Sequence, residues 1–282
     1  MRVLVTGLAG FTGGYLKAEL EKHGHVVIGL QADLTDYDAI ATEIKKTSPE
    51  AVAHLAGVAF VGHGDANAFY QVNLMGTRNL LAALAQHAPD VSTVLLASSA
   101  NVYGNSSEGT LDEHTQPDPA NDYAVSKLSM EHMARLWSNR LPIFIVRPFN
   151  YTGVGQDEKF LIPKIVSHFR DRKSIIELGN LDVSRDFGDV RAVAEAYRKL
   201  LEICPASKTI NVCTGCAHTL REVIGRCEKV TGHQIEIQVN PTFVRTNEVR
   251  VLIGDNCLLN QLINDWQPYS LEETLRWMLQ AA

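Results

Sequence analysis

Short apolar runs alternate with helical patterns through the first half of the chain. Each run has the length of a strand and is almost continuously apolar; the runs cover 3–5, 26–30, 51–55, 94–97 and 143–146. Strands that are apolar on both faces are typical of a parallel sheet covered by helices on each side. Between the runs, the pattern predicts helices near 13–23, 36–46, 66–87 and 120–139. The alternation predicts an α/β fold of the Rossmann type, a doubly wound parallel sheet.

After about residue 150 this rhythm loosens, because Pro148, Gly153, Gly155 and Pro163 interrupt the chain. Shorter elements follow: helices near 159–172, 190–202, 219–231, 258–262 and 271–279, and strands near 175–178 and 209–213. No low-complexity linker or repeat separates the halves. We therefore expect a Rossmann domain over 1–150 and a smaller C-terminal α/β cap over 151–282. Part of about 186–215 is expected to return to the Rossmann sheet.

Composition excludes several classes of protein. The 282 residues are 45% hydrophobic and 21% charged, as in soluble globular proteins. A net charge of −6 without a Lys/Arg block argues against nucleic-acid or anionic-membrane binding. No apolar run approaches the ~18–20 residues that span a bilayer. Five cysteines, an odd count, and the absence of a signal-peptide pattern predict a cytoplasmic protein.

A glycine-rich segment follows the first predicted strand and opens the first helix. Gly7 permits a tight turn, Gly10 lets the backbone approach a pyrophosphate, and Gly13 lets the helix and strand pack closely. The helix N-terminus, beginning near Phe11 and Thr12, would point its N–H groups at the phosphates. The spacing G-x-x-G-x-x-G differs from the standard fingerprint, and a structural turn without a ligand is the alternative interpretation.

The residues after the second predicted strand would form the adenosine end of such a site. A ribose-binding acid is expected about 20 residues further on. The second strand ends Gly29-Leu30-Gln31 without one, and Asp33 follows soon after. Asp33 could reach the adenine edge, or could cap the next helix together with Asp36. No arginine lies nearby to hold a 2′-phosphate, so the choice between NAD and NADP stays open.

Serine, tyrosine and lysine side chains indicate chemistry beside this turn. Ser98 and Ser99 follow the fourth strand, where α/β sheets bind ligands. Tyr123 and Lys127 are four residues apart and share a helix face. A neighbouring ammonium lowers the pKa of a phenol, so Tyr123 is predicted to be acidic and to exchange a proton with a substrate oxygen while a hydride moves. Taken without its context, such a pair is more often an ordinary surface contact.

With these motifs the chain resembles the extended short-chain dehydrogenase/reductase family, the nucleotide-sugar epimerases, dehydratases and reductases. The resemblance covers nearly the whole chain. The segments RPFNYTGVGQ (147–156) and LGNLDVSRDFGDVR (178–191) look most like the GDP-4-keto-6-deoxy-D-mannose reductases. The remaining motifs are TGLAGFTG (6–13), HLAG (54–57), VNLMGTRNLL (72–81), SSANVYG (98–104), YAVSK (123–127) and VLIGDNCLLNQLINDWQP with its SLEETL helix (251–275).

The resemblance implies the roles of particular residues and a substrate-binding function for the cap. Ser99, Tyr123 and Lys127 match the catalytic residues, and no metal is implied. The residues matching the NAD or NADP site are Gly7, Gly10, Phe11, Thr12, Gly13, Asp33, Leu34, Leu55, Ala56, Gly57, Asn73, Ala97, Ser98, Tyr123, Lys127, Arg147 and Pro148. Those matching the nucleotide-diphosphate-sugar site are Ser99, Ala100, Asn101, Asn150, Gln156, Leu178, Gly179, Asn180, Arg185, Arg245 and Glu248. A homodimer is also implied, through the helices around 66–87 and 120–139, although simple packing on the sheet explains their apolar residues equally well.

Departures from the family pattern narrow the activity. Dehydratases place an acid two residues after the catalytic serine, where this chain has Asn101, so dehydration is disfavoured. The stretch 58–61 lacks the lysine that UDP-hexose 4-epimerases often carry. We expect NAD(P)H-dependent reduction of the C4 keto group of a nucleotide-linked 4-keto-6-deoxyhexose, in deoxysugar or cell-surface polysaccharide biosynthesis. The alternatives are an NAD-dependent nucleotide-sugar 4-epimerase and a catalytically silent dinucleotide-binding protein.

One C-x-x-C motif is interpreted as structural. Cys213 and Cys216 lie in a predicted turn between a strand and a helix that Thr219 would cap. A redox pair or half of a zinc site is the alternative, but no second pair completes a metal site.

Overall fold

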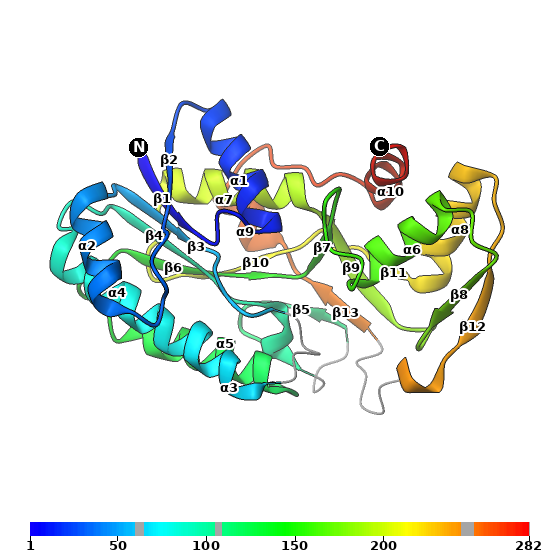
Figure 1. Cartoon of the computed structure of the whole chain (residues 1–282), viewed down its shortest axis with the longest axis horizontal. Helices are drawn as coiled ribbons and strands as arrows, with labels where there is room; N and C mark the ends of the chain where they lie inside the picture. The colour runs from blue at the N-terminus through cyan, green and yellow to red at the C-terminus, as the bar shows by residue number, and fades with distance from the viewer. Residues whose placement is uncertain (60–64, 105–108, 244–250, 282) are drawn as a thin grey trace.

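A six-stranded parallel sheet forms the first half of the molecule (Figure 1). The structure is a computed structural model and describes residues 1–59, 65–104, 109–243 and 251–281. The strand order is β10-β6-β4-β3-β1-β2, and all neighbouring strands are parallel. The predicted Rossmann-type sheet is therefore confirmed. Its strands are β1 (Arg2–Thr6), β2 (Val26–Gly29), β3 (Ala51–His54), β4 (Thr93–Ala97), β6 (Ile143–Pro148) and β10 (Thr209–Val212).

Helices cover both faces of this sheet because its strands are apolar on both sides. In β1, Val3 and Val5 pack into one core, and Leu4 packs into the other. The first core is completed by α1 (Phe11–Lys22), α7 (Val190–Ile203) and α9 (Cys257–Leu262). The second is completed by α2 (Tyr37–Thr47), α4 (Thr77–His87) and α5 (Asp122–Arg135). The carboxyl ends of the strands face the second half of the molecule (Figure 1).

The predicted helix at 66–87 is helical but not uniform. It consists of α3 (Ala66–Ala68), a π-helical segment η1 (Phe69–Gly76) and α4. Within η1 the Asn73 side chain bonds both backbone groups of Val58, accepting from its N–H at 2.9 Å and donating to its carbonyl at 3.1 Å. π-Helical turns are rare and occur frequently at functional sites. Periodicity could not reveal this one, since the wider turn accompanies contacts with a distant loop.

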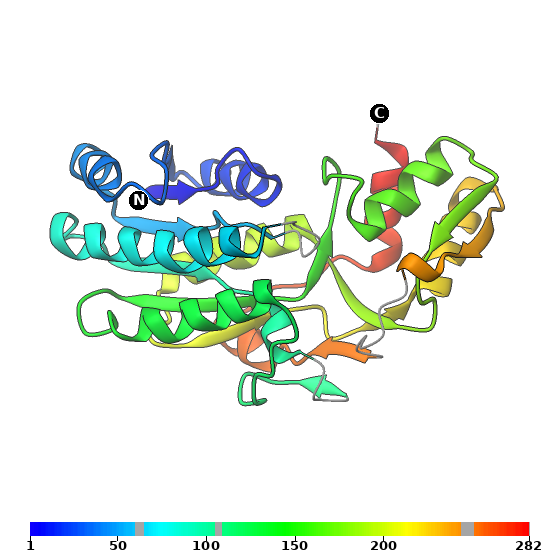
Figure 2. The ribbon, with the colours of Figure 1, turned by 60° about the horizontal axis from the view of Figure 1, so that its bottom comes forward.

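The second half consists of short strands packed against helices (Figure 2). One sheet has the order β11-β9-β13-β5, with β7 paired to β9, and β12 pairs with β8. A third core lies among α6 (Leu161–Arg170), α8 (Leu220–Thr231) and α10 (Leu271–Gln280). The strands are β5 (Thr110–Leu111), β7 (Asn150–Thr152), β8 (Ile175–Leu178), β9 (Ser184–Asp189), β11 (Ala217–Thr219), β12 (Glu236–Val239) and β13 (Val251–Gly254), with short 3₁₀ turns η2 (Ala100–Tyr103) and η3 (Pro241–Phe243).

Most of these short strands have no counterpart in the predictions. Only β8 was expected at its observed position. β9 carries Ser184, Arg185, Asp186 and Asp189, so its sequence lacks the apolar run of a strand. Asp186 is nevertheless buried, because the backbone N–H groups of Thr214 and Gly215 donate to its carboxylate at 3.0 and 2.8 Å.

An aromatic cluster joins the start of α1 to the second half. The Phe11 ring stacks on Tyr151 of β7, with centroids 6.3 Å apart, and Tyr15 meets Trp277 of α10 edge-on at 6.0 Å. The hydroxyls of Thr12 and Tyr151 are hydrogen-bonded at 2.8 Å. The glycine-rich turn is thus packed directly against the second half of the chain.

Candidate functional site

The glycine-rich turn has the geometry that its sequence predicts. Gly7 has a φ of +71°, a conformation that residues with side chains rarely adopt. A Cβ on Gly13 would lie 2.6 Å from the Leu8 carbonyl oxygen and closer still to that of Gly7. Gly10 is the N-cap of α1, and no side chain caps the helix there. A turn closed to side chains beside an uncapped helix N-terminus fits a dinucleotide pyrophosphate.

Carboxylates lie beside the chain segment that follows β2. The Asp33 carboxylate accepts hydrogen bonds from the Thr35 backbone and hydroxyl, both 2.8 Å, and these bonds lower the pKa of Asp33. Asp36, not Asp33, caps α2 by accepting from Ala39. Leu34 is buried. Glu43 of α2 accepts from the Gln31 backbone N–H at 2.9 Å, so its carboxylate lies beside the end of β2.

Serine, tyrosine and lysine meet where β4 ends against α5. The Tyr123 hydroxyl lies close enough to the Ser99 side chain for that side chain to lower its pKa. One helical turn further on, the Lys127 ammonium donates to the Ala97 carbonyl at 2.8 Å. All three predicted catalytic side chains are buried and lie at the carboxyl end of the central sheet. The structure therefore brings them together, although Ser99 is separated from Tyr123 and Lys127 by more than twenty residues of sequence.

The pKa of the Tyr123 phenol corrects one prediction. Burial raises this pKa to about 12, the Ser99 side chain opposes the increase, and Tyr151 adds to it. The expectation that Lys127 makes the phenol acidic is wrong for the protein alone. Burial lowers the pKa of Lys127 to about 8, against the opposing effect of Glu131. For both Tyr123 and Lys127, the loss of solvation on burial is the largest contribution to the pKa shift, and it favours the uncharged form of each side chain.

Residues after β3 adjoin the lysine. A Cβ on Gly57 would lie 2.8 Å from Asn73 Oδ1 and 3.3 Å from Lys127 Nζ. Asn73 also donates to the Ser126 hydroxyl at 3.0 Å, which ties η1 to α5. The backbone N–H groups of Leu55 and Ala56 donate to the carbonyl and the hydroxyl of Thr6 at the end of β1. The predicted cofactor residues Leu55, Ala56, Gly57 and Ala97 therefore lie at the carboxyl ends of β3 and β4, the edge at which α/β sheets bind ligands.

His54 occupies the middle of this strand edge as a packing residue. Its ring nitrogens are 2.7 Å from the Thr6 hydroxyl and 2.8 Å from the Thr77 hydroxyl. Burial lowers the pKa of His54 to about 3. The imidazole is therefore neutral near neutral pH and links β1, β3 and α4.

Arg147 and Glu131 form a buried ion pair beneath the serines. Arg147 Nη2 donates to Glu131 Oε2 at 2.6 Å, and Nε donates to Oε1 at 3.0 Å. The Arg147 guanidinium, predicted to contact the cofactor, is thus engaged inside the protein, and Pro148 ends β6 beside it. The predictions did not include Glu131. Its position four residues after Lys127 and eight after Tyr123 on one helix face was the available signal.

Several of the residues predicted to bind substrate lie in the second half. Asn150 of β7 and Arg185 of β9 are on paired strands, and Arg185 donates to the Ser184 carbonyl at 2.9 Å. Gln156 closes the turn after β7 by accepting from the Thr152 hydroxyl. Ala100 and Asn101 open η2, and the predicted segment Leu178, Gly179 and Asn180 follows β8. Arg245 and Glu248 lie outside the described residues.

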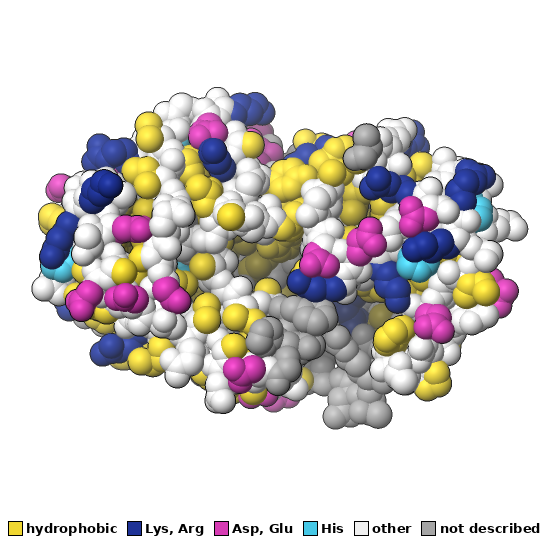
Figure 3. All heavy atoms as spheres, in the orientation of Figure 1, with side chains coloured by type: hydrophobic (Ala, Val, Ile, Leu, Met, Phe, Trp, Pro, Cys, Tyr) yellow, Lys and Arg dark blue, Asp and Glu magenta, His cyan; other side chains and the backbone are white. Residues whose placement is uncertain are grey.

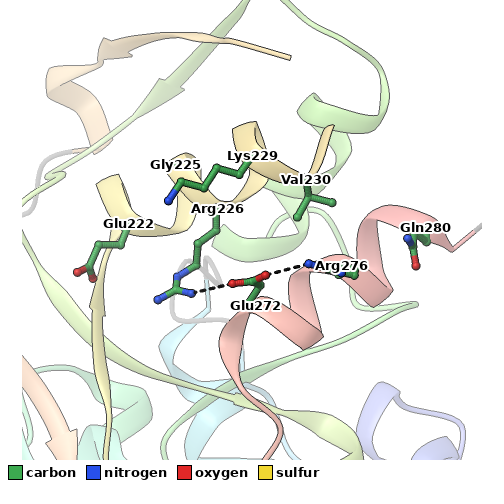
Figure 4. Close-up of a pocket in the computed structure, with 8 residues that line it drawn as sticks. All are labelled: Glu222, Gly225, Arg226, Lys229, Val230, Glu272, Arg276 and Gln280. Carbon is green, nitrogen blue, oxygen red and sulfur yellow. Dashed lines mark hydrogen bonds and ion pairs between the residues drawn. The ribbon is translucent and has the colours of Figure 1, made fainter. Parts of the chain in front are cut away.

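A hollow separates the two halves, and hydrophobic side chains gather on its floor (Figure 3). A different depression, between α8 and α10, is unrelated to these groups (Figure 4). Two of its cations, Arg226 and Arg276, both pair with Glu272, at 3.6 and 2.9 Å. The charges in this depression thus largely satisfy one another, and we do not regard it as the active site.

The C-x-x-C cysteines are not paired. Cys213 is buried and Cys216 is exposed, and burial raises the pKa of the Cys213 thiol.

Within the described ranges, no group of three or more His, Cys, Asp or Glu side chains could hold a metal ion. No helix in that same part of the chain is sufficiently long and apolar to cross a membrane.

The fold and this strand edge define a dinucleotide-binding α/β protein. The model of the NAD dependent epimerase/dehydratase family matches residues 3–213. The chain therefore belongs to the NAD-dependent epimerase/dehydratase family, whose members depend on NAD(P). The resemblance inferred from the motifs is confirmed.

Two curated relatives align over almost the whole chain. GDP-6-deoxy-D-talose 4-dehydrogenase of Aggregatibacter actinomycetemcomitans is 37% identical, with 99% of this chain and 97% of that protein covered. GDP-6-deoxy-D-mannose reductase of Pseudomonas aeruginosa is 35% identical, covering 99% and 96%.

Solved structures of related proteins superpose on nearly the whole chain. A candidate epimerase from Burkholderia cenocepacia superposes with a TM-score of 0.94 at 47% identity, covering 99% of this chain and 96% of that one. RMD from Pseudomonas aeruginosa complexed with NADPH gives 0.89 at 33% identity, covering 99% and 97%. UDP-glucose 4-epimerase of Thermus thermophilus in complex with NAD gives 0.86 at 27% identity, covering 99% and 98%.

Proposed function

We propose that this protein catalyses the NAD(P)H-dependent reduction of the C4 keto group of a nucleotide-linked 4-keto-6-deoxyhexose, with a GDP-sugar as the favoured substrate. The observation that carries the proposal is the meeting of Ser99, Tyr123 and Lys127 at the carboxyl end of β4, beside the glycine-rich turn. Both curated relatives described above are named for GDP-6-deoxyhexoses and for oxidation or reduction. We place the reaction in deoxysugar or cell-surface polysaccharide biosynthesis.

Each catalytic side chain has one role in this scheme. A bound nicotinamide supplies the hydride that reaches C4. Tyr123, whose pKa is about 12, stays protonated at neutral pH and donates its proton to the C4 oxygen. Ser99 orients that oxygen by a hydrogen bond. Lys127, whose ammonium donates to the Ala97 carbonyl, would hold the ribose of the bound dinucleotide beside Tyr123.

The substrate diphosphate requires cationic and polar partners from the second half. Arg185 and Asn150 lie on the paired strands β9 and β7, and Arg245 is proposed as a second cation. A guanidinium matches the geometry of phosphate oxygens. Asn101 follows Ser99 at the start of η2, where a dehydratase would need an acid. An amide cannot accept a proton from carbon, which supports reduction over dehydration.

The second candidate is a 4-epimerase that uses the same residues twice, first oxidising and then reducing one carbon. It is favoured by the similarity to UDP-glucose 4-epimerases, such as that of Halalkalibacterium halodurans at 27% identity. The two reactions differ in cofactor consumption. A reductase consumes one reduced dinucleotide per product, which is followed by the loss of its near-ultraviolet absorbance, whereas an epimerase retains its NAD and shows no net consumption.

Replacing the phenol tests the mechanism. We expect Tyr123→Phe to lower kcat roughly 10²–10⁴-fold while dinucleotide binding is retained, because only the transferable proton is removed. Tyr37→Phe is the matched control, since the Tyr37 hydroxyl donates to Gln86 on the α2–α4 side, away from the site. Unchanged turnover of Tyr123→Phe would refute the proposed proton donor.

We also propose that the enzyme is a cytoplasmic homodimer that contacts its partner through η1, α4 and α5. Met75 on η1 is 42% exposed and Leu136, after α5, is 81% exposed. By contrast, Leu84 and Met130 belong to the core under the sheet. Light scattering coupled to size exclusion measures the mass, and a value of 31.1 kDa would refute the dimer.

A further inference from the structure

Three consecutive residues at the end of β4 are each held by a different turn of α5. The Ser99 side chain lies beside the Tyr123 hydroxyl, and the Ala97 carbonyl accepts a hydrogen bond from Lys127. Between them, the Ser98 hydroxyl donates to Glu131 Oε1 at 2.5 Å. Tyr123, Lys127 and Glu131 occupy positions i, i+4 and i+8, so they lie along one face of the helix. Two of these contacts involve proposed catalytic groups, and the third has no role in the mechanism above.

Glu131 is a fixed anchor rather than a mobile side chain. Its carboxylate is fully buried and paired with Arg147, which projects from β6, the neighbour of β4 in the sheet. The Arg147 guanidinium carbon lies 4.8 Å from the centre of the Tyr103 ring, and the Tyr103 hydroxyl donates to Asn211 of β10 at 2.7 Å. The network therefore joins α5 to β4, β6 and β10, which are neighbours in the sheet. A buried charge with a bidentate partner has a single well-defined position.

This anchor acts on the serine at the head of the catalytic turn. The Ser98 backbone N–H donates to the Val146 carbonyl at 2.8 Å, so Ser98 is held at both its backbone and its side chain. Ser99 follows in an extended conformation, and its hydroxyl accepts from the Asn101 N–H at 3.2 Å to begin η2. With Ser98 released, the chain between β4 and η2 would keep fewer constraints on the direction of the Ser99 hydroxyl.

We propose that Glu131, held by Arg147, is a positioning residue that sets the orientation of Ser99 through its hydrogen bond with Ser98. The inference rests on the proposed function, because Ser99 is its catalytic target. It also explains why a carboxylate and a guanidinium are buried behind the site, where neither can reach a substrate. Misplacement of a catalytic group by about 1 Å can cost about 100-fold in rate.

The test compares two hydroxyl deletions on the same strand. Ser98→Ala removes the contact with Glu131 and leaves the ion pair intact. Thr93→Ala is the matched control, because Thr93 lies at the other end of β4, and its buried hydroxyl makes no hydrogen bond with any described residue. We expect Ser98→Ala to lower kcat roughly 10- to 100-fold with an unchanged KM for both substrates, and Thr93→Ala to keep wild-type kcat. Ser98→Thr, which keeps the hydroxyl, should restore most of the activity.

Three kinetic outcomes would overturn the positioning role. A raised KM for the dinucleotide in Ser98→Ala would mean that the hydroxyl contacts the cofactor instead. Equal losses in Ser98→Ala and Thr93→Ala would indicate a general packing effect. Unchanged kcat in Ser98→Ala would show that the contact does not matter for turnover.

A second measurement does not depend on the substrate. Peptide-resolved hydrogen exchange over residues 98–104 should be about 10-fold faster in Ser98→Ala than in wild type or Thr93→Ala, since the loss of a charged hydrogen bond loosens the turn. Unchanged exchange in Ser98→Ala would overturn the positioning role, whether or not the wild-type protein reduces a keto-sugar. Faster exchange in Ser98→Ala, together with a wild-type protein that does not reduce a keto-sugar, would refute only the proposed function.

Discussion

Adjacent glycines in α1 have opposite surroundings, which permits a controlled test of the glycine-rich turn. Gly13 is buried, and a Cβ added to it would lie 2.6 Å from the Leu8 carbonyl oxygen and 2.7 Å from the Leu8 Cα. Both atoms are backbone, so they cannot rotate away as a side chain could. A Cβ on Gly14 would have no atom within 4 Å. Gly13→Ala and Gly14→Ala therefore make the same chemical change in the same helix.

The magnitudes follow from two opposing effects. Alanine stabilises a helix interior relative to glycine by about 0.5–1 kcal/mol, and both variants gain this. Forcing an extra carbon into a packed site costs about 1–3 kcal/mol, and only Gly13→Ala suffers this cost. The free energy of unfolding of Gly14→Ala should thus rise by about 0.5–1 kcal/mol. The difference between the variants isolates the steric clash and should be about 1–3 kcal/mol.

Urea denaturation followed by tryptophan fluorescence measures these free energies, and a dinucleotide titration on the folded variants measures binding. Gly13→Ala should also bind dinucleotide more weakly, because relief of the clash displaces the Gly7–Leu8 backbone from the turn. Equal stability of the two variants would refute the claim that close packing requires glycine at position 13. Equal dinucleotide affinity would refute the claim that this turn forms the phosphate site.

Two further predictions concern charge. His54 binds a proton with a pKa near 6.5 in the unfolded chain but about 3 in the fold, so the unfolded state binds more protons below pH 6.5, and stability falls as the pH falls. The loss in the free energy of unfolding is about 2 kcal/mol at about pH 5, and His54→Gln should remove it. The free energy of unfolding of both proteins, measured from about pH 8 to about pH 5, should therefore fall more steeply for the wild type, and equal pH dependence would contradict the prediction. The carboxylates of Asp33 and Glu43 at the end of β2 should repel a 2′-phosphate, so NADH should bind more tightly than NADPH, and Glu43→Gln should narrow the difference in calorimetric titrations. Tighter binding of NADPH by the wild type would show that these carboxylates do not face the ribose.

The polar strands and the π-helical segment show where sequence patterns stop being informative. The parallel strands of the first half are visible because each is continuously apolar, as burial on two faces demands. β9 has no such run, since its Asp186 is accommodated by backbone N–H groups of a loop nearly thirty residues away. The π-helical turn at Asn73 likewise accompanies contacts with Val58, which periodicity along the segment does not contain.

The amino-acid sequence by itself determined the Rossmann sheet, the glycine-rich turn and the pairing of Tyr123 with Lys127 on one helix face. These features depend on periodicity, local backbone geometry and i, i+4 spacing, which are properties of neighbouring residues. Only the tertiary structure decided that the pKa of the Tyr123 phenol is raised and that the Ser98 hydroxyl is hydrogen-bonded to Glu131. Burial and the identity of a distant hydrogen-bond partner arise when separate segments pack together, so the ionisation of the site is a property of the folded chain.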